Sequence, residues 1–173
     1  LVGWGPIAQR LAQFLQMLSL KVTVVRQLPQ IATTPSDQPR MITYQDLPTV
    51  LPTTHWLILT CPLTDTTRGL VNAKTLALMP KGAGLVNVAR GPVVNTEDLL
   101  AAVKTGRIRA ALDVTDPEPL PADHELWRTP GVLISPHVGG NTTAFLPRAY
   151  RLVREQLQRY VANEPLHNIM TAP

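Results

Sequence analysis

The chain opens on Leu1-Val2-Gly3-Trp4-Gly5-Pro6-Ile7-Ala8, a glycine-rich turn between an apolar pair and a run with helical periodicity. Gly3 allows a tight turn, Gly5 lets the backbone approach a pyrophosphate, and Ala8 stands where the helix packs on the strand. Pro6 suits the first helical position but has no N–H group to offer. A bound anion therefore depends on the N–H of Ile7, its neighbours and the helix dipole. This pattern predicts a dinucleotide-binding turn.

Short apolar runs alternate with helical patterns along the rest of the chain. The runs lack polar alternation, as expected for parallel strands covered on both faces, and fall at 21–25, 56–61, 84–88, 108–114 and 132–135. Helical patterns fall at 6–20, 46–51, 72–79, 96–105 and 143–162. The alternation predicts an α/β fold, a doubly wound parallel sheet of the Rossmann type. The proline-rich residues 27–45 are predicted to form a surface connection.

Several residues mark the ends and faces of the predicted helices. Asn95 can cap the helix at 96–105, and Gly106 can close it. Pro147 is tolerated only within the first turn of the last helix, which places the start of that helix near Thr143. The last helix carries an apolar stripe that includes Phe145. The face of the first helix that we expect to be buried comprises Ile7, Leu11, Phe14, Leu15 and Leu18.

The composition narrows the class of protein. Hydrophobic residues make up 45% of the chain and charged residues 16%, as in a globular protein. No apolar run approaches the ~20 residues of a membrane span, and the single cysteine, Cys61, has no partner for an internal disulfide. We therefore expect a cytoplasmic protein with no membrane association. The net charge is +4, but the basic residues are dispersed, and the cluster Arg148, Arg151, Arg154 and Arg159 has the helical spacing of a solvated face. Neither a nucleic-acid partner nor a metal site is predicted.

The residue after the next predicted strand bears on the choice of dinucleotide. An acidic residue there accepts hydrogen bonds from the ribose hydroxyls of NAD. Here Val25 is followed by Arg26, whose guanidinium would pair with the 2′-phosphate of NADP. Arg26 therefore favours NADP over NAD, although an exposed arginine that stacks on adenine is an alternative reading.

Three further stretches carry a family resemblance. They are CPLTDTTRGLVNAKTLALMPKGAGLVNVARGPVVNTEDL (61–99), ALDVTDPEPLP (111–121) and VLISPHVGG (132–140). Together with the opening turn they closely resemble the D-isomer-specific 2-hydroxyacid dehydrogenases, and the resemblance extends through NEPLHNI near the end of the chain. It implies a catalytic triad of Arg90, Glu118 and His137, each within its matching motif.

The resemblance also implies the role of each member of this triad. Arg90 holds the substrate carboxylate and polarises the 2-oxo group. Glu118 hydrogen-bonds to His137 and favours its imidazolium form. His137 then donates a proton to the forming alkoxide as hydride arrives from the nicotinamide, and acts as the base in the reverse reaction.

The cofactor contacts follow from the same resemblance. Asp113 stands where the family contacts the nicotinamide carboxamide, and Val88 and Ala89 would flank the nicotinamide. Cys61 and Pro62 stand where the chain passes the adenosine half. The full cofactor-binding set that we predict is Gly3, Gly5, Pro6, Ile7, Arg26, Cys61, Pro62, Val88, Ala89, Asp113 and Gly139.

Members of this family are two-domain enzymes that use NAD or NADP. The resemblance assigns residues 1–140 to the dinucleotide-binding domain, with a truncated first strand, and 141–173 to a C-terminal helix and tail. On this resemblance we expect the N-terminal part of the substrate domain to be absent from this sequence. We expect the protein to transfer a hydride from NAD(P)H to a small 2-oxo acid, giving a D-2-hydroxy acid. We also expect it to form a homodimer. This piece alone is expected to turn over poorly, because the missing part would close over the substrate.

Other activities on the same fold stay open. Glu118 argues against a formate dehydrogenase, which carries glutamine at this position. Phosphite dehydrogenases keep a similar triad, so an inorganic substrate is an alternative. A dinucleotide-sensing scaffold, similar to the transcriptional corepressors that share this fold, is the alternative outside enzymology.

Overall fold

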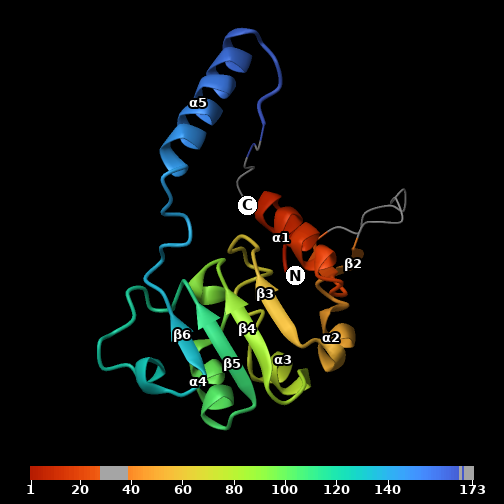
Figure 1. Cartoon of the computed structure of the whole chain (residues 1–173), viewed down its shortest axis with the longest axis vertical. Coiled ribbons are helices and arrows are strands. Elements are labelled where there is room, and N and C mark those ends of the chain that lie inside the picture. Colours follow the sequence, from red (N-terminus) through yellow and green to blue (C-terminus); the bar gives the residue numbers. More distant parts are fainter. Residues whose placement is uncertain (28–38, 168, 170–173) are drawn as a thin grey trace. The chain divides into compact units, whose positions relative to one another are not determined.

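Parallel strands form the sheet of the N-terminal part of the chain in the computed structural model, which describes residues 1–27, 39–167 and 169 (Figure 1). The chain divides into two compact units, Leu1–Pro136 and His137–Pro173. In the first unit β1 (Thr23–Arg26) pairs with β2 (Arg40–Thr43). A four-stranded sheet follows in the order β3 (Trp56–Leu59), β4 (Ala83–Asn87), β5 (Ile108–Leu112) and β6 (Val132–Ile134). Every pairing is parallel.

The first residues of the chain join the two sets of strands. Val2 bridges to Val25 of β1 and to Leu59 of β3, both in parallel. The N–H of Gly3 donates to the carbonyl of Val25 at 2.8 Å, and the N–H of Thr60 donates to the carbonyl of Val2 at 2.9 Å. The strand order is therefore β2, β1, the 1–3 segment, β3, β4, β5 and β6, which confirms the predicted doubly wound sheet. Its topological switch point lies at the opening segment, where such sheets bind ligands.

Helices connect these strands. They are α1 (Pro6–Met17), α2 (Leu47–Val50), α3 (Ala73–Leu78) and α4 (Thr96–Lys104), with 3₁₀ turns at Leu51–Thr53, Gly91–Val93 and Glu125–Arg128. The predicted cap of α4 is confirmed, since the Asn95 side chain accepts a hydrogen bond from the N–H of Asp98 at 3.0 Å. Gly106 follows this helix with a φ of 64°, the left-handed conformation that ends helices.

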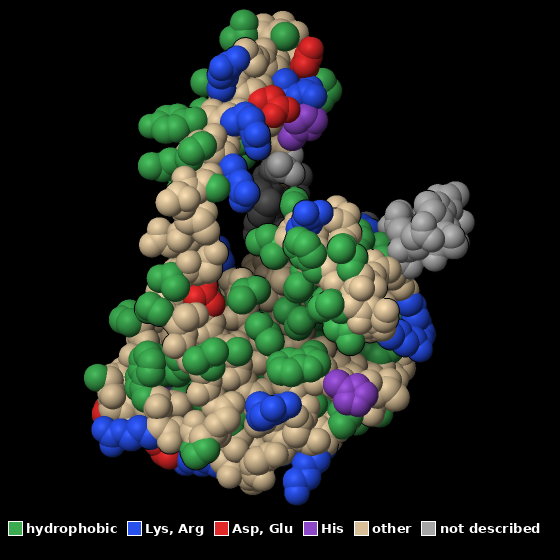
Figure 2. Space-filling view, in the orientation of Figure 1, with side chains coloured by type: hydrophobic (Ala, Val, Ile, Leu, Met, Phe, Trp, Pro, Cys, Tyr) green, Lys and Arg blue, Asp and Glu red, His purple; other side chains and the backbone are tan. Residues whose placement is uncertain are grey.

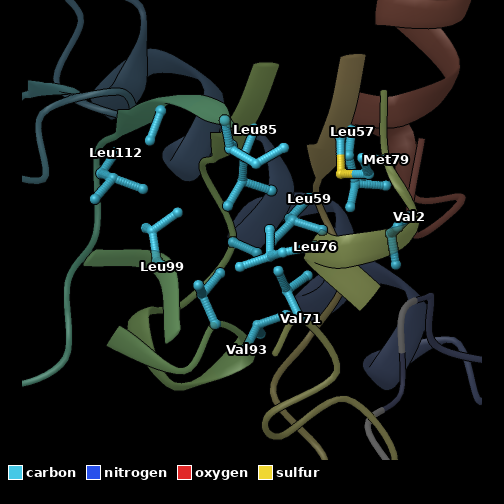
Figure 3. Packing of buried hydrophobic residues seen from close by; sticks show 14 of the residues in the cluster. Val2, Leu57, Leu59, Val71, Leu76, Met79, Leu85, Val93, Leu99 and Leu112 are labelled. Carbon is cyan, nitrogen blue, oxygen red and sulfur yellow. The ribbon is translucent and has the colours of Figure 1, made fainter. Parts of the chain in front are cut away.

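The core lies between one face of the sheet and the helices α3 and α4. The strand register places Leu57, Leu85 and Ala110 in one row, all buried. Leu76 of α3 and Leu99 of α4 are 1% exposed and belong to the same cluster (Figure 3). Burying side chains of this size contributes roughly 1.5–3 kcal/mol each, so this layer holds the strand ends in place.

The opposite face of the four-stranded sheet is exposed in the described part of the chain, so the expectation of strands covered on both faces was wrong here. Trp56 is 56% exposed and Leu133 is 69% exposed. The guanidinium of Arg109 lies over the Trp56 ring, 5.6 Å from its centroid. Figure 2 shows hydrophobic side chains gathered on the visible face of the molecule. The cause is the hand of the connections, since right-handed crossovers that proceed in one direction along a sheet place successive helices on one face.

Two other expectations were also wrong. Strand β2 lies within residues 27–45, predicted as a surface connection, of which 28–38 lie outside the described residues. In α1 the buried residues are Ala8 and Ala12, whereas Ile7 is 68% and Leu18 is 71% exposed. Small side chains let a helix approach its neighbours closely. The face of α1 that carries Ala8 and Ala12 is therefore the one that packs against the rest of the unit.

The second unit contains α5 (Phe145–Val161). This helix begins just after the predicted Thr143, and Pro147 lies in its first turn as expected. None of its residues is buried, and its apolar stripe includes Tyr150 and Val161, which are 75% and 80% exposed. Within residues 1–27, 39–167 and 169, no helix has both the length and the apolar character to cross a membrane.

Candidate cofactor-binding and active site

Several predicted site residues of the first unit lie at or just beyond the carboxyl ends of the strands. Arg26 is the last residue of β1, Cys61 follows β3, the 88–90 segment follows β4, and Asp113 follows β5. Because the strands are parallel, their carboxyl ends share one edge of the sheet. The structure therefore brings these residues to the edge at which the opening turn also lies.

Gly3 is required by close packing against the segment after β3. Its φ is 102°, and a Cβ placed on it would lie 2.9 Å from the amide nitrogen of Cys61 and 3.0 Å from the Cα of that residue. Such distances are too short for a methyl group facing backbone atoms. The hydroxyl of Thr60 also donates to the carbonyl of Val2 at 2.9 Å. The opening turn and the 60–62 segment are thus fixed against each other.

Gly5 and Pro6 begin α1 in an arrangement suited to an anion. Gly5 is the N-cap residue in an extended conformation, with no side chain to cap the helix, and Pro6 follows at the first helical position. A Cβ on Gly5 would meet no atom within 4 Å, so the space beside it is open. The N–H groups of the first helical turn have no intrahelical acceptor. Ile7 and Ala8 carry such groups, and they can bind a phosphate there.

The loop after β4 carries Arg90 and is held by a buried amide. Asn87, the last residue of β4, is 1% exposed. Its Oδ1 accepts from the N–H of Ala89 at 3.0 Å, and its Nδ2 donates to the carbonyl of Arg90 at 3.0 Å. The side chain of Arg90 is exposed and its Nη1 donates to the carbonyl of Ala89 at 2.6 Å. Sequence reasoning missed Asn87, although a polar residue at the end of an apolar strand is a usable signal.

The turn that carries Glu118 is packed against the Arg90 loop. A Cβ on Gly91 would lie 1.8 Å from the carbonyl oxygen of Thr115 and 2.8 Å from the amide nitrogen of Asp116. The Thr96 hydroxyl donates to the carbonyl of Asp116 at 2.6 Å. These contacts anchor the start of the Asp-Pro-Glu-Pro turn, on which Glu118 is exposed. This role of Gly91 could not be predicted from the sequence, because the residues that it contacts are distant along the chain.

Asp113 is oriented by Ser135. The Ser135 hydroxyl donates to Oδ1 of Asp113 at 2.6 Å, and the N–H of Asp113 donates to the carbonyl of Asn87 at 2.9 Å. The carboxylate therefore leaves the end of β5 in a defined direction. Ser135 is a further residue that the sequence interpretation did not identify.

Cys61 and Arg26 differ in environment. Cys61 is 3% exposed, and burial raises the pKa of its thiol from 9.0 to about 11, so the thiol is protonated at neutral pH. A neutral buried thiol is no nucleophile, and the contribution of Cys61 to a site is limited to its backbone. Arg26 is half-buried and pairs in register with Thr43 of β2. Hydrogen bonds from Thr43 lower the pKa of Asp46, which stays ionised beyond the end of β2.

His137 and Gly139 belong to the second unit, which begins at His137. The backbone of His137 has a φ of 53°, in the left-handed region. The hydrogen bond between Glu118 and His137 stays a prediction.

A parallel sheet with a glycine turn at its switch point and polar side chains at the same strand ends defines a dinucleotide-binding α/β domain. The family model described as D-isomer specific 2-hydroxyacid dehydrogenase, NAD binding domain, matches residues 1–139, and the chain belongs to this family.

The chain is similar to glyoxylate/hydroxypyruvate reductase B of Enterobacter agglomerans, with 39% identity over 120 residues that cover 69% of this chain and 36% of the relative. It is 41% identical to the glyoxylate reductase of Thermofilum pendens over 115 residues, 66% of this chain and 34% of the relative. The chain thus spans only about a third of the length of these relatives.

Solved structures show the same relationship. A D-isomer specific 2-hydroxyacid dehydrogenase from Xanthobacter autotrophicus Py2, in complex with NADPH and MES, has a TM-score of 0.88 at 33% identity, over 98% of this chain and 69% of that one. The NADPH-dependent glyoxylate/hydroxypyruvate reductase of Sinorhizobium meliloti, in complex with NADP and sulfate, has a TM-score of 0.87 at 25% identity, over 98% of this chain and 54% of that one.

Proposed function

We propose that this chain is the dinucleotide-binding part of an NAD(P)H-dependent oxidoreductase that reduces a small 2-oxo acid to a D-2-hydroxy acid. One observation carries the proposal: the opening glycine turn and the loop of Arg90 lie at the same edge of the sheet. The names of the relatives, glyoxylate and hydroxypyruvate reductases, support the substrate class.

The residues at this edge fit a dinucleotide. The open space beside Gly5 and the free N–H groups of the first turn of α1 suit the pyrophosphate. Cys61 and Pro62 would line the adenosine half, and Val88 and Ala89 the nicotinamide. When bound, the reduced nicotinamide supplies a hydride. Asp113, oriented by Ser135, would accept hydrogen bonds from the carboxamide.

In the proposed reaction Arg90 binds the substrate carboxylate through its guanidinium and polarises the 2-oxo group. His137 donates a proton to the oxygen of that group and becomes the base in the reverse direction. Glu118 hydrogen-bonds to His137 and favours its protonated form. Gly139 would lie beside the cofactor. No nucleic acid takes part in this proposal.

The proposal is tested first by cofactor binding to the 173-residue chain and then by turnover in the full-length gene product. Titration with NADPH and NADH, followed by fluorescence, should show saturable binding. Turnover is measured with glyoxylate, hydroxypyruvate, pyruvate, bulkier 2-oxo acids and phosphite. His137→Ala should lose most of the turnover and keep the dissociation constant for the cofactor. Cofactor binding without turnover of any of these substrates would instead support a dinucleotide-sensing scaffold.

We also propose NADP as the preferred cofactor, because Arg26 ends β1 and can pair with a 2′-phosphate. The NADPH and NADP bound to the Xanthobacter and Sinorhizobium proteins support this preference. Arg26→Gln should weaken NADPH binding about tenfold, the size of one charge-assisted hydrogen bond, and leave NADH binding unchanged. Tighter binding of NADH than of NADPH by the wild type would exclude this role for Arg26.

We further propose that residues 1–140 form the dinucleotide-binding domain, that 141–173 form the helix and tail, and that the protein is a cytoplasmic homodimer. The compact unit that ends at Pro136 supports the division of the chain. The exposed apolar stripe of α5 supports its burial against further protein. Light scattering after gel filtration of the full-length gene product tests the dimer, and a monomeric mass would exclude it.

A further inference from the structure

Asn87 stands apart from its neighbours in the sheet. It is the polar residue that ends the apolar strand β4, and it is 1% exposed. Burying an amide is costly unless its donor and acceptor groups are satisfied. Here the acceptor Oδ1 bonds to the N–H of Ala89 and the donor Nδ2 bonds to the carbonyl of Arg90, both at 3.0 Å. The side chain thus holds the backbone of its own following loop.

The same residue also ties that loop to the neighbouring strand. The carbonyl of Asn87 accepts from the N–H of Asp113 at 2.9 Å. Beyond Arg90, the backbone of Gly91 lies against Thr115, with no room for a Cβ. Arg90 is therefore held on its N-terminal side by Asn87 and on its C-terminal side by the contact of Gly91.

We infer that Asn87 is a positioning residue that fixes the backbone of Arg90 so that its guanidinium meets the substrate carboxylate in one orientation. The inference rests on the proposed function, in which Arg90 binds that carboxylate. The hydrogen-bond requirement is specific, since the site needs one acceptor and one donor from a side chain of this size. Aspartate supplies the acceptor but sets an oxygen against the carbonyl of Arg90. Alanine supplies neither group.

Replacing Asn87 should impair the use of substrate much more than the binding of cofactor. A reacting group displaced by about 1 Å can lose on the order of 100-fold in rate. For Asn87→Asp and Asn87→Ala we expect kcat/KM for the 2-oxo acid to fall by about 10- to 100-fold, with a raised KM. The dissociation constant for NADPH should change less, by no more than about threefold, because the opening turn that binds the pyrophosphate is untouched and the disturbed loop reaches the cofactor only through Ala89, beside the nicotinamide.

Two further measurements separate positioning from a loss of stability. Thr129→Val is the matched control, because it removes another partly buried hydrogen bond. This bond joins the Thr129 hydroxyl to the carbonyl of Glu125 at 2.9 Å, across the 3₁₀ turn Glu125–Arg128. The control substitution should lower the urea midpoint with kcat/KM unchanged. Asn87→Asp offers rescue by pH, because a protonated carboxyl regains the donor that faces the carbonyl of Arg90. The ratio of its kcat/KM to that of the wild type should rise as the pH falls.

The experiment is steady-state kinetics and NADPH titration on the full-length gene product with these three substitutions. A selective loss of kcat/KM, with the pH-dependent recovery of Asn87→Asp, supports the inference. A kcat/KM equal to that of the wild type in both Asn87 variants overturns the inference. It is also overturned if Thr129→Val, at an equal loss of stability, loses as much kcat/KM as the Asn87 variants. If Asn87→Ala does not fold, Asn87→Asp alone decides. An absence of turnover in the wild type overturns the proposed function and this inference with it, whereas active wild type and equally active variants overturn the inference alone.

Discussion

Adding one methyl group at Gly91 should destabilise the chain more than adding it at any glycine with open space beside it. In Gly91→Ala the new Cβ would lie 1.8 Å from the carbonyl oxygen of Thr115, 2.3 Å from its carbonyl carbon and 2.8 Å from the amide nitrogen of Asp116. All three atoms belong to the backbone, so no side chain can rotate out of the way. The loop of Arg90 and the 115–116 segment must move apart.

The size of the effect follows from these distances. Ordinary contact begins at 3.4 Å, so the two segments must separate by roughly 1.6 Å. Overpacking of this kind costs about 1–3 kcal/mol, and occasionally more. Loss of the hydrogen bond from Thr96 to the carbonyl of Asp116 adds about 1 kcal/mol. We expect the free energy of unfolding to fall by about 3 kcal/mol, which at an m-value of about 2 kcal/mol/M lowers the urea midpoint by about 1.5 M.

Urea unfolding followed by tryptophan fluorescence measures this change in the 173-residue chain. Gly5→Ala is the matched control, because a Cβ there meets nothing within 4 Å and φ is −78°. Its cost should be about 1 kcal/mol or less, from a poorer N-cap. If Gly91→Ala yields no folded protein while Gly5→Ala folds, the reasoning holds. Equal midpoints for the two variants would refute the argument from space.

Three other substitutions test the described contacts. Gly3→Ala should lower the free energy of unfolding by about 2 kcal/mol and weaken NADPH binding at least about tenfold, because φ is 102° and the new Cβ would lie 2.9 Å from the amide nitrogen of Cys61. An NADPH titration curve equal to that of the wild type would contradict this prediction. Burial raises the pKa of the Cys61 thiol from 9.0 to about 11, so the buried neutral thiol contributes its full stability below about pH 9. As the pH rises from 9 to 11, the free energy of unfolding should fall by roughly 2–3 kcal/mol. In Cys61→Ala the plot of urea midpoint against pH should be flatter over this pH range. A slope equal to that of the wild type would show that Cys61 does not cause the loss of stability. The Arg107 guanidinium donates to three carbonyls at the end of α3, those of Leu76, Ala77 and Met79. Arg107→Ala should therefore lower the free energy of unfolding, measured by calorimetry, by about 1–3 kcal/mol. Arg128→Ala is the control, and it should lower this free energy by much less because Arg128 is exposed.

The fold could be predicted where the sequence signal is local. The runs that became β3, β4 and β5 are continuous and apolar, and the glycine turn marks the opening segment that bridges β1 and β3 before α1. Strand β2 escaped prediction because only Ile42 of its residues is buried, and its pairing with β1 is decided by tertiary contact. The buried face of α1 was misassigned because periodicity shows where apolar residues gather, whereas the distance between helix and strands decided that Ala8 and Ala12 are buried.

The site divides in the same way. Arg90 and Asp113 were proposed from their motifs, and the structure places both of them just beyond the ends of strands. Asn87, Gly91 and Ser135 were missed because what they do depends on partners in other segments, such as Thr115 for Gly91. A motif specifies which side chains are present, but the contacts that orient them appear only when the strands are aligned.

The need for such contacts grows with distance from the sheet. The N–H of Val88 donates to the carbonyl of Leu59 at 3.3 Å, and the N–H of Asp113 donates to that of Asn87 at 2.9 Å, so hydrogen bonds between strands continue into the first residue of each loop. Residues within one or two positions of a strand end therefore need few additional contacts. Glu118 lies farther along its loop and needs a second anchor, which Gly91 and Thr96 provide at residues 115–116. For this reason a substitution at Gly91, which bears no chemistry of its own, should disturb the relation between Arg90 and Glu118 more than a substitution in the strands that carry them.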